Sequence, residues 1–251
     1  MADSLQGTVA LVTGASSGIG EATAVALAEQ GARVALVARR EDRLKALAER
    51  IGDAALVIEA DVTEDTQARK AVERTVSELG RLDTLVNNAG MMLLGPIENA
   101  PIEEWEQMIA INLRGLLYCT HAALPHLLKA ADGDPRHVAD LVNISSVAGR
   151  VARLGSGVYN LTKHGVGAFS ESLRQEVTQR HVRVSLVEPG AVATELSSHN
   201  RPEIQELIGK RFGNVERLEA QDIADAIVYI VTRPRHVAVN EILVRPTEQT
   251  G

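Results

Sequence analysis

The stretch "VALVTGASSGIG" occupies residues 9–20, and it decides the fold. An apolar run of strand length, residues 9–12, leads into a turn that contains Gly14, Gly18 and Gly20, and a helical pattern begins near Gly18. Glycines let the backbone turn tightly and approach a ligand closely, while the N–H groups at a helix start attract an anion such as a pyrophosphate. Such a turn could instead only pack a strand against a helix. The order strand, turn, helix favours nucleotide binding.

Six further apolar runs follow along the chain, at residues 34–37, 54–58, 82–86, 138–144, 182–187 and 241–244. Helical patterns begin near Glu41 and Glu64, and two long ones cover residues 102–130 and 157–180. This alternation predicts a parallel sheet, and because the runs are continuously apolar, both faces of the sheet should be covered by helices. The expected fold is therefore α/β, a doubly wound seven-stranded parallel sheet in a single domain over residues 1–251.

Composition narrows the functional classes. The net charge of −7 argues against a broad attraction to nucleic acid or to an anionic membrane surface. Cys119 is the only cysteine, which excludes a disulfide framework and a cysteine-based metal site and favours the cytoplasm. The first residues do not follow a signal-peptide pattern, and no apolar run reaches membrane-spanning length. Two segments are expected to be irregular, residues 131–136 and a long polar insertion at 192–217, and insertions of the second kind are often lids.

Polar residues follow the third and fourth predicted strands. Asp61 ends the third run, where it could accept a hydrogen bond from an adenine amino group or could simply start the next helix. The sequence "NNAG" (87–90) ends the fourth run; Asn87 and Asn88 could cross-link strand ends, and Gly90 would let the backbone approach a ligand. Open α/β sheets bind ligands at the carboxyl ends of their strands, so these residues are expected at one site.

Four polar residues are the candidates for the catalytic groups. Tyr159 and Lys163 lie four apart in "YNLTK" on a predicted helix, which places them on one face. A nearby cation would lower the tyrosine pKa and make it a usable acid or base. Ser146 ends the fifth run, and Asn112 is a polar residue in an apolar helical stretch, where a buried amide needs partners. Each residue alone has an ordinary structural explanation, but their combination points to a catalytic site.

Together these motifs resemble the short-chain dehydrogenase/reductase family over nearly the whole chain, in "TGASSGIG", "NNAG", Asn112, "NISS" (143–146), "YNLTK" and "EPGAVATE" (188–195). The resemblance implies a Rossmann fold, a dinucleotide, no metal, and a homotetramer or homodimer built through the two long helices. Tyr159 would be the general acid, Ser146 would hold the carbonyl oxygen, Lys163 would bind the nicotinamide ribose and lower the tyrosine pKa, and Asn112 would fix a proton-relaying water. The cofactor would lie against Gly14, Ser16, Ser17, Gly18, Ile19, Gly20, Arg39, Arg40, Asp61, Val62, Asn88, Ala89, Gly90, Tyr159, Lys163, Pro189, Gly190, Val192 and Thr194.

Residues 38–40 are expected to decide between NADPH and NADH. Ala38 stands where an NAD-binding protein of this type would carry an acidic residue, so no carboxylate there repels a 2′-phosphate. The Arg39 guanidinium can pair with that phosphate, and Arg40 is the second candidate. A charged helix start would explain Glu41 and Asp42 but not two arginines, which oppose the helix dipole. Ser17 in the turn is not basic and offers no second clamp. NADPH is therefore expected, mainly on the basis of Arg39.

A closer resemblance, in "MMLLGPIE", "AALPHLL", "FSESLRQEV", "QDIADAI" and "EILVRPT", is to the NADPH-dependent clavulanate-type aldehyde reductases, a branch that also includes NADP-dependent 3-hydroxy acid and serine dehydrogenases. Arg150, Arg153, His199 and Arg201 could bind a carboxylate-bearing aldehyde or could be ordinary solvated residues. The leading hypothesis is a reductase of a small-molecule aldehyde or ketone. The alternatives are an NADP-dependent dehydrogenase of a 3-hydroxy acid or similar alcohol, and a nucleotide sensor without chemistry.

Overall fold

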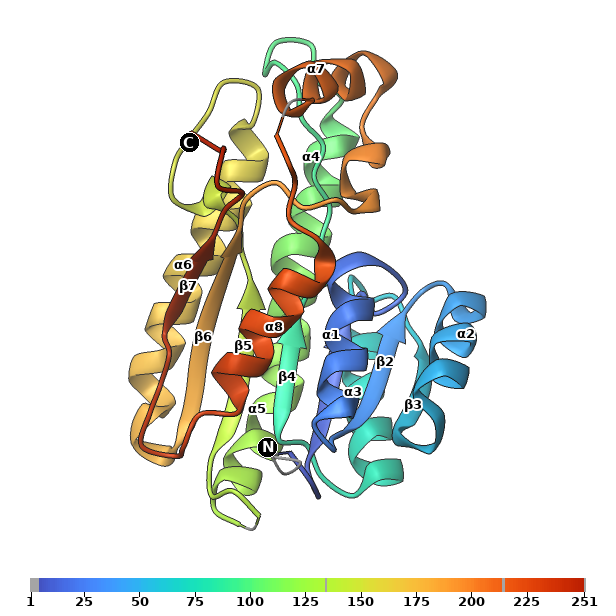
Figure 1. Ribbon diagram of the computed structural model, residues 1–251, viewed down its shortest axis with the longest axis vertical. Helices are drawn as coiled ribbons and strands as arrows, with labels where there is room; N and C mark the ends of the chain where they lie inside the picture. The colour runs from blue at the N-terminus through green and yellow to red at the C-terminus, as the bar shows by residue number, and fades with distance from the viewer. Residues whose placement is uncertain (1–4, 134, 214, 251) are drawn as a thin grey trace.

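In a computed structural model, which describes residues 5–133, 135–213 and 215–250, seven strands form one sheet in the order β3-β2-β1-β4-β5-β6-β7 (Figure 1). All neighbouring pairs are parallel. The strands are β1 (Val9–Thr13), β2 (Arg33–Ala38), β3 (Ala55–Glu59), β4 (Thr84–Asn87), β5 (Ala139–Ile144), β6 (Val182–Pro189) and β7 (Glu241–Val244). Each overlaps one of the predicted apolar runs, so the predicted α/β fold with a seven-stranded parallel sheet is confirmed.

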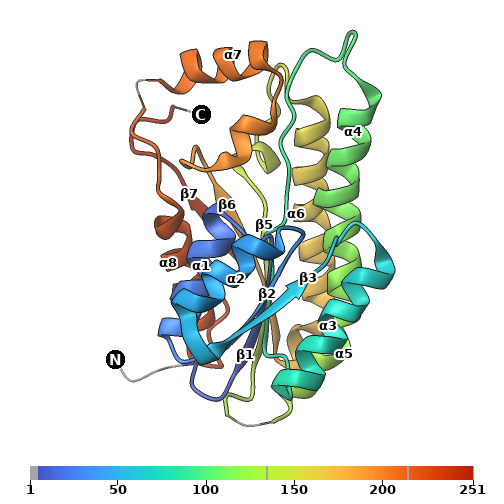
Figure 2. The same cartoon turned by 90° about the vertical axis from the view of Figure 1, so that its right-hand side faces the viewer.

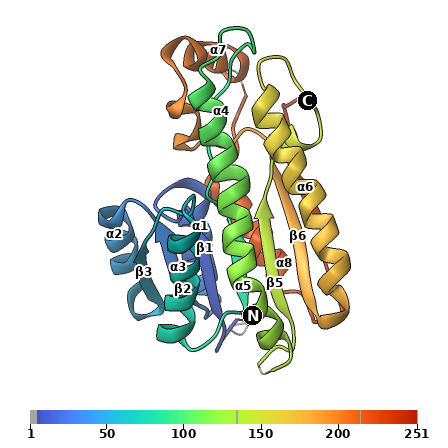
Figure 3. The ribbon, with the colours of Figure 1, turned by 180° about the vertical axis from the view of Figure 1, so that it is seen from behind.

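Helices cover both faces of the sheet (Figure 2). One face packs against α1 (Gly18–Glu29), α2 (Glu41–Ile51) and α8 (Ala220–Val231), and the other against α3 (Asp65–Leu79), α5 (Leu116–Ala131) and α6 (Gly157–Val177), with α4 (Ile102–Ile109) continuing α5 upward (Figure 3). Short 3₁₀ turns lie at Gly52–Ala54, Val147–Gly149 and Thr178–Arg180. A doubly wound arrangement of this kind buries the strands on both sides, as their continuous apolar runs predict.

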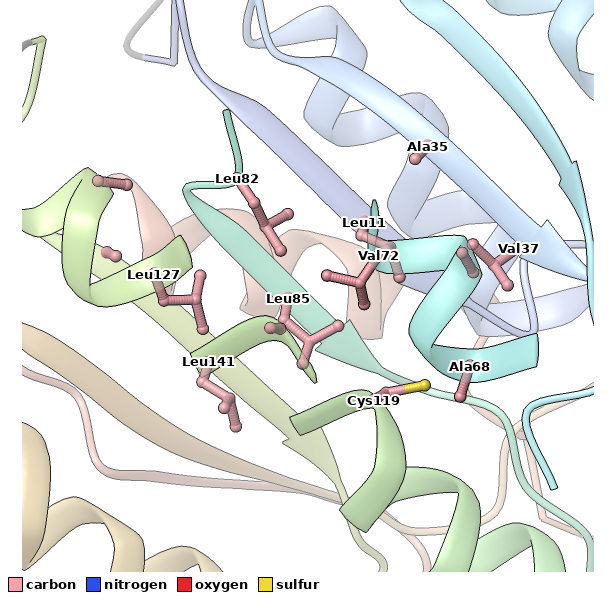
Figure 4. Close-up of a cluster of buried hydrophobic side chains, with 14 of the residues drawn as sticks. Leu11, Ala35, Val37, Ala68, Val72, Leu82, Leu85, Cys119, Leu127 and Leu141 are labelled. Atoms are coloured by element: carbon pink, nitrogen blue, oxygen red, sulfur yellow. The ribbon is translucent and has the colours of Figure 1, made fainter. Parts of the chain in front are cut away.

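The two faces of β1 show how the core is divided. Leu11 points into a cluster with Leu85, Leu141 and Leu127 beneath α3 and α5 (Figure 4), whereas Ala10 and Val12 point into the cluster beneath α1 and α8. Successive strand residues face opposite sides of a sheet, so a fully apolar strand serves both cores. With only 2% aromatic residues, the interior is built from aliphatic side chains.

Three elements differ from the expectations. The long helical pattern at 102–130 is interrupted by a π-helical segment, Ala110–Gly115. The 192–217 segment is not irregular throughout, because it holds a 3₁₀ helix, η5 (Glu195–His199), and the helix α7 (Pro202–Phe212), which begins with a proline at its first turn. The helix α8 was not predicted at all. In the 131–136 segment, residue 134 lies outside the described residues.

The apolar stripe on α6 belongs to the core and not to an external surface. Val166, Leu173 and Val177 are buried, and Phe169 packs against the same clusters. Leu117 on α5 and Leu161 on α6 are instead exposed, at 40% and 59%. Within the described ranges, the structure contains no helix that is both long enough and apolar enough to cross a membrane.

The strand order reverses direction between β1 and β4. From β1 the chain proceeds outward to β2 and β3, then returns to place β4 on the other side of β1. At such a point the loops leaving the two strands diverge and open a crevice at their carboxyl ends. The glycine turn after β1 and the "NNAG" sequence after β4 both lie at this crevice.

Candidate active site

A cavity of about 480 Å³ lies at the carboxyl ends of the strands. It extends from the end of β2 past the glycine turn to α6 and the 192–217 segment. Of the residues predicted to be catalytic or to contact the cofactor, all but Gly20 and Asn112 line it: Gly14, Ser16, Ser17, Gly18, Ile19, Arg39, Arg40, Asp61, Val62, Asn88, Ala89, Gly90, Ser146, Tyr159, Lys163, Pro189, Gly190, Val192 and Thr194. The predicted nucleotide and catalytic residues are therefore brought together in one elongated site.

The three glycine positions of the turn have little or no room for a side chain. Gly14 and Gly18 have positive φ angles of +66° and +56°, a backbone region that glycine adopts without steric cost. Gly20 lies beneath the turn, where a Cβ atom would overlap the Gly14 carbonyl oxygen and the Asn88 amide. The turn thus presents bare backbone at the N-terminus of α1, a suitable geometry for the pyrophosphate of a dinucleotide.

Hydrogen bonds hold the turn to the end of β4. The Asn88 amide donates to the Thr13 carbonyl oxygen at 2.9 Å, and the Thr13 hydroxyl accepts from the backbone N–H groups of Asn88 and Ala89, both at 3.0 Å. Asn87 donates to Asn143 on β5 at 2.9 Å. The expected cross-link between strand ends is present, and Thr13 is a partner that the sequence interpretation missed.

The Asp61 side chain holds the turn before α3 and also lines the cavity. One carboxylate oxygen accepts from the backbone N–H and the hydroxyl of Thr63, at 3.0 and 2.7 Å, which fixes the turn before α3. The side chain still lines the cavity, and its other oxygen lies 3.9 Å from Arg39. Arg39 itself is mostly exposed, with 62% of its side chain accessible.

Arg40, and not Arg39, is directed at the glycine turn. Its guanidinium donates to the hydroxyls of Ser16 at 3.1 Å and Ser17 at 2.8 Å. It also donates to Glu195 at 2.9 Å, and Arg43 donates to the second oxygen of the same carboxylate at 2.7 Å. Arg43 and Glu195 were not predicted from the sequence. Ser17 offers no charge, as expected, but it does take part through its hydroxyl.

Tyr159 lies in the first turns of α6, almost completely buried beside Ser146. Burial raises the pKa of its phenol to about 12, and a hydrogen bond with Ser146 opposes this increase. The sequence predicted that Lys163 would lower the Tyr159 pKa. In the structure this pKa is raised instead, because removal of the phenol from water disfavours the phenolate more strongly than any neighbour favours it. Tyr159 therefore carries its proton at neutral pH.

Lys163 is also buried, one helical turn after Tyr159. Its ammonium donates to the carbonyl oxygen of Ile144 at 2.9 Å and lies 5.8 Å from the centre of the Tyr159 ring. Burial lowers its pKa to about 8. A positively charged, hydrogen-bond-donating group is thus held at the end of β5, close to the tyrosine and facing the cavity.

Both polar atoms of the Asn112 side chain are hydrogen-bonded to protein groups. Its carbonyl oxygen accepts from the N–H of Met91 at 2.8 Å, and its amide donates to the carbonyl oxygen of Met91 at 2.9 Å and to the Thr162 hydroxyl at 3.1 Å. It lies in the π-helical segment, a kind of local distortion that is frequent at functional sites. Asn112 thus ties the loop after β4 to the helix that carries Tyr159.

The four residues considered for carboxylate binding separate into two pairs. Arg150 is bound by Glu188 and Glu241, and Arg201 by Glu104 and Glu203, so both are structural. Arg153 and His199 line the cavity. The backbone N–H of Arg153 donates to Asn160 at 3.1 Å, directly after Tyr159 in sequence. The position of Arg153 is therefore fixed relative to the tyrosine.

Comparisons with known proteins identify the family. Residues 8–205 match the short chain dehydrogenase family. An uncharacterized oxidoreductase of Staphylococcus epidermidis is 39% identical over 238 residues, which are 95% of this chain and 96% of the relative. The closed form of serine dehydrogenase complexed with NADP+ is 33% identical, covers 97% of both chains and has a TM-score of 0.89. The 3-ketoacyl-(acyl-carrier-protein) reductase from Brucella melitensis, complexed with NADH, is 30% identical, covers 96% of this chain and 98% of its own, and has a TM-score of 0.84. The chain is an oxidoreductase and belongs to the short-chain dehydrogenase family.

Proposed function

We propose that the protein is an NADPH-dependent reductase that converts an aldehyde or ketone to an alcohol. One observation carries this proposal: Tyr159, Ser146 and Lys163 meet at one end of a cavity whose other end holds Arg39 and Arg40 beside a bare glycine turn. The glycine positions fit a dinucleotide, because a Cβ atom at Gly14 or Gly20 would press against Asn88 and nearby backbone, so glycine lets the turn keep the shape that presents its N–H groups to a pyrophosphate. The bound cofactor would supply the hydride.

The protein's own groups supply the proton and the orientation. Because burial raises its pKa to about 12, the Tyr159 phenol remains protonated at neutral pH and donates to the carbonyl oxygen as negative charge develops there. The Ser146 hydroxyl holds the same oxygen. Lys163, which loses its proton near pH 8 in this site, would bind ribose hydroxyls and stabilise the tyrosinate that remains after proton transfer. Asn112 would keep Met91 and the helix of Tyr159 in register, with a proton-relaying water as its further role.

The NADPH preference is proposed from the end of β2. Ala38 leaves the ribose position without a carboxylate, while the Arg39 and Arg40 guanidinium groups line the cavity there and suit a 2′-phosphate. The likeness to a serine dehydrogenase complexed with NADP+ supports this choice, although the 3-ketoacyl reductase was solved with NADH. Asp61 and Val62 would lie against the adenine, and Pro189, Gly190, Val192 and Thr194 against the nicotinamide half.

An NADP-dependent dehydrogenase of a 3-hydroxy acid is the second candidate. It is favoured by the likeness to serine dehydrogenase and by Arg153, whose guanidinium could bind a substrate carboxylate. The sequence resemblance to clavulanate-type aldehyde reductases favours reduction. The rates of carbonyl reduction with NADPH and of hydroxy acid oxidation with NADP+ distinguish the two directions.

We also propose that the chain is a single catalytic domain with a lid at residues 192–217, and that it works in the cytoplasm as a homotetramer or homodimer. The exposed Leu117 and Leu161 on α5 and α6 favour pairing of these helices with a second copy. Sedimentation of the purified chain measures the assembly, and a monomer at micromolar concentration would contradict it.

Replacement of Tyr159 by phenylalanine tests the mechanism. Tyr159→Phe removes the proton donor and should lower the turnover of NADPH with a carbonyl substrate by at least about 100-fold. Binding of NADPH, measured by titration, should change by no more than about twofold, because the nucleotide contacts remain. Tyr229→Phe, an exposed position on α8, is the matched control. Undiminished turnover in Tyr159→Phe would show that Tyr159 is not the acid, whereas NADPH binding without any turnover in the wild type would favour a nucleotide sensor without chemistry.

A further inference from the structure

The carboxylate of Glu195 is bound by two of the arginines at the end of β2. Arg40 and Arg43 donate to its two oxygens at 2.9 and 2.7 Å. The hydrogen bonds from Arg43 and Arg40 lower the Glu195 pKa to about 2, so the carboxylate is charged at neutral pH. Arg40 is at the same time held against the glycine turn by Ser16 and Ser17. An anion therefore already occupies Arg40, which lines the cavity where the cofactor's ribose is expected, together with the neighbouring Arg43.

Glu195 begins η5, at the start of the 192–217 segment above the cavity. Thr194, the residue before Glu195, packs closely over Gly18. A Cβ atom added to Gly18 would lie 3.0 Å from the Thr194 methyl group. At the other end of η5, Asn200 accepts from the N–H of Leu94 at 2.7 Å and donates to the carbonyl oxygen of Met92 at 2.9 Å. The segment is thus fastened at two points, one on each half of the site.

We propose that Glu195 competes with the cofactor's 2′-phosphate for Arg40 and Arg43, which makes it a residue that sets cofactor selectivity and couples it to the 192–217 segment. A nucleotide with the phosphate displaces Glu195 from the two arginines and frees this end of the segment. A nucleotide without the phosphate leaves the contact in place. The proposal rests on the proposed function only in that the 2′-phosphate is bound beside Arg40.

Charge makes the exchange feasible. A phosphate monoester carries a charge of about −1.5 to −2 at neutral pH. It therefore binds two guanidinium groups more strongly than a single carboxylate does. Glu195 cannot remain beside a bound phosphate without like-charge repulsion. The side chains of Arg40, Arg43 and Glu195 are 40%, 44% and 43% exposed, and ion pairs this accessible to water are weak enough to exchange.

Removal of the Glu195 charge tests the proposal. In Glu195→Gln the competitor is neutral, so the Kd for NADP+ should fall by about three- to tenfold while the Kd for NAD+ stays within about twofold, both by calorimetry. Glu41→Gln is the matched control, since Glu41 lies on α2 next to Arg40, is comparably exposed and pairs only with Lys45 among the described residues. It should change neither Kd.

Amide hydrogen exchange at residues 195–199 gives an independent measurement. Exchange in the nucleotide-free enzyme should be faster in Glu195→Gln than in the wild type, and in the wild type NADP+ should protect these amides less than NAD+ does. An unchanged or weaker NADP+ affinity in Glu195→Gln would overturn the proposal. If the wild type shows no preference for NADP+ over NAD+, the proposed cofactor is wrong. In that case a selective gain of NADP+ affinity in Glu195→Gln would still support the competition. Without such a gain, the proposed cofactor and the proposed competition would both be overturned.

Discussion

Lys163 carries its charge where water hardly reaches it. A hydrogen bond to the Ile144 carbonyl oxygen and the Tyr159 ring, whose centre lies 5.8 Å from the ammonium, compensate only in part, and burial lowers the Lys163 pKa from near 10.5 to about 8. Between these values the unfolded chain binds a proton that the folded chain does not, so the free energy of unfolding rises with pH in this range. Below about pH 8 both states are protonated, and the buried charge costs stability in full. The residue is thus kept for function at the expense of the fold.

Lys163→Met should therefore stabilise the protein at pH 7. We expect the free energy of unfolding to increase by about 1–3 kcal/mol, a magnitude that corresponds to the lowered lysine pKa, and this gain should shrink as the pH rises from 8 to 10.5. Urea unfolding at pH 7 and pH 10 measures it. The raised pKa of Tyr159 lowers stability only above about pH 10, outside the range that is compared. Lys70→Met, at an exposed position of α3, is the control, and equal gains at both pH values would contradict the interpretation.

The residues that could be predicted from the sequence are those that stand in local motifs. Tyr159 and Lys163 are one helical turn apart, and the glycines are within eight positions of one another, so spacing alone brings them together. Arg43 and Glu195 are 152 positions apart, and only the sheet order places them in contact. Arg39 and Arg40 are adjacent, and the sequence favoured Arg39; the side-chain directions that bring Arg40 to the turn depend on Ser16 and Ser17, whose position the fold determines.

At the scale of elements, the strands were predictable because their burial on both faces leaves continuous apolar runs. The helix α8 was missed although its signal was present: Glu219 and Asp222 form a capping box, and Ile223, Ile227 and Ile230 then recur at helical spacing. The helix α7 has a weaker signal because it lies above the cavity and buries little. The π-helical segment around Asn112 depends on the Met91 and Thr162 contacts, which the local sequence does not reveal.

A substitution in the turn between β1 and α1 should weaken both nucleotide binding and the fold. Gly20→Ala places a Cβ atom against backbone, so the turn must shift; we expect nucleotide binding to weaken by at least about tenfold and the free energy of unfolding to fall by about 1–3 kcal/mol. Gly209→Ala, on α7 with nothing within 4 Å of the added atom, should instead stabilise the fold by about 0.5–1 kcal/mol and leave binding unchanged. Calorimetry with NADP+ and urea unfolding measure both variants. Wild-type affinity in Gly20→Ala would show that the turn does not contact the cofactor.

At the scale of the whole molecule, the point where β1 and β4 diverge creates one cavity with two chemically different ends. The end near β2 carries arginines and hydroxyls, and the end near α6 carries a protonated phenol, a serine and a buried lysine. Composition and alternation of elements predicted the sheet, but the order of the strands, and hence the distance between the two ends, follows from how the chain folds back across β1.

The most direct test is the initial rate of carbonyl reduction by the purified protein with NADPH and with NADH, over a panel of aldehydes and ketones with and without a carboxylate. We expect reduction of at least one carbonyl substrate with a kcat/KM about tenfold or more higher for NADPH than for NADH, and we expect Arg39→Ala and Arg40→Ala to diminish this ratio. An equal or higher kcat/KM with NADH, or no reduction of any carbonyl compound with either nucleotide, would contradict the account.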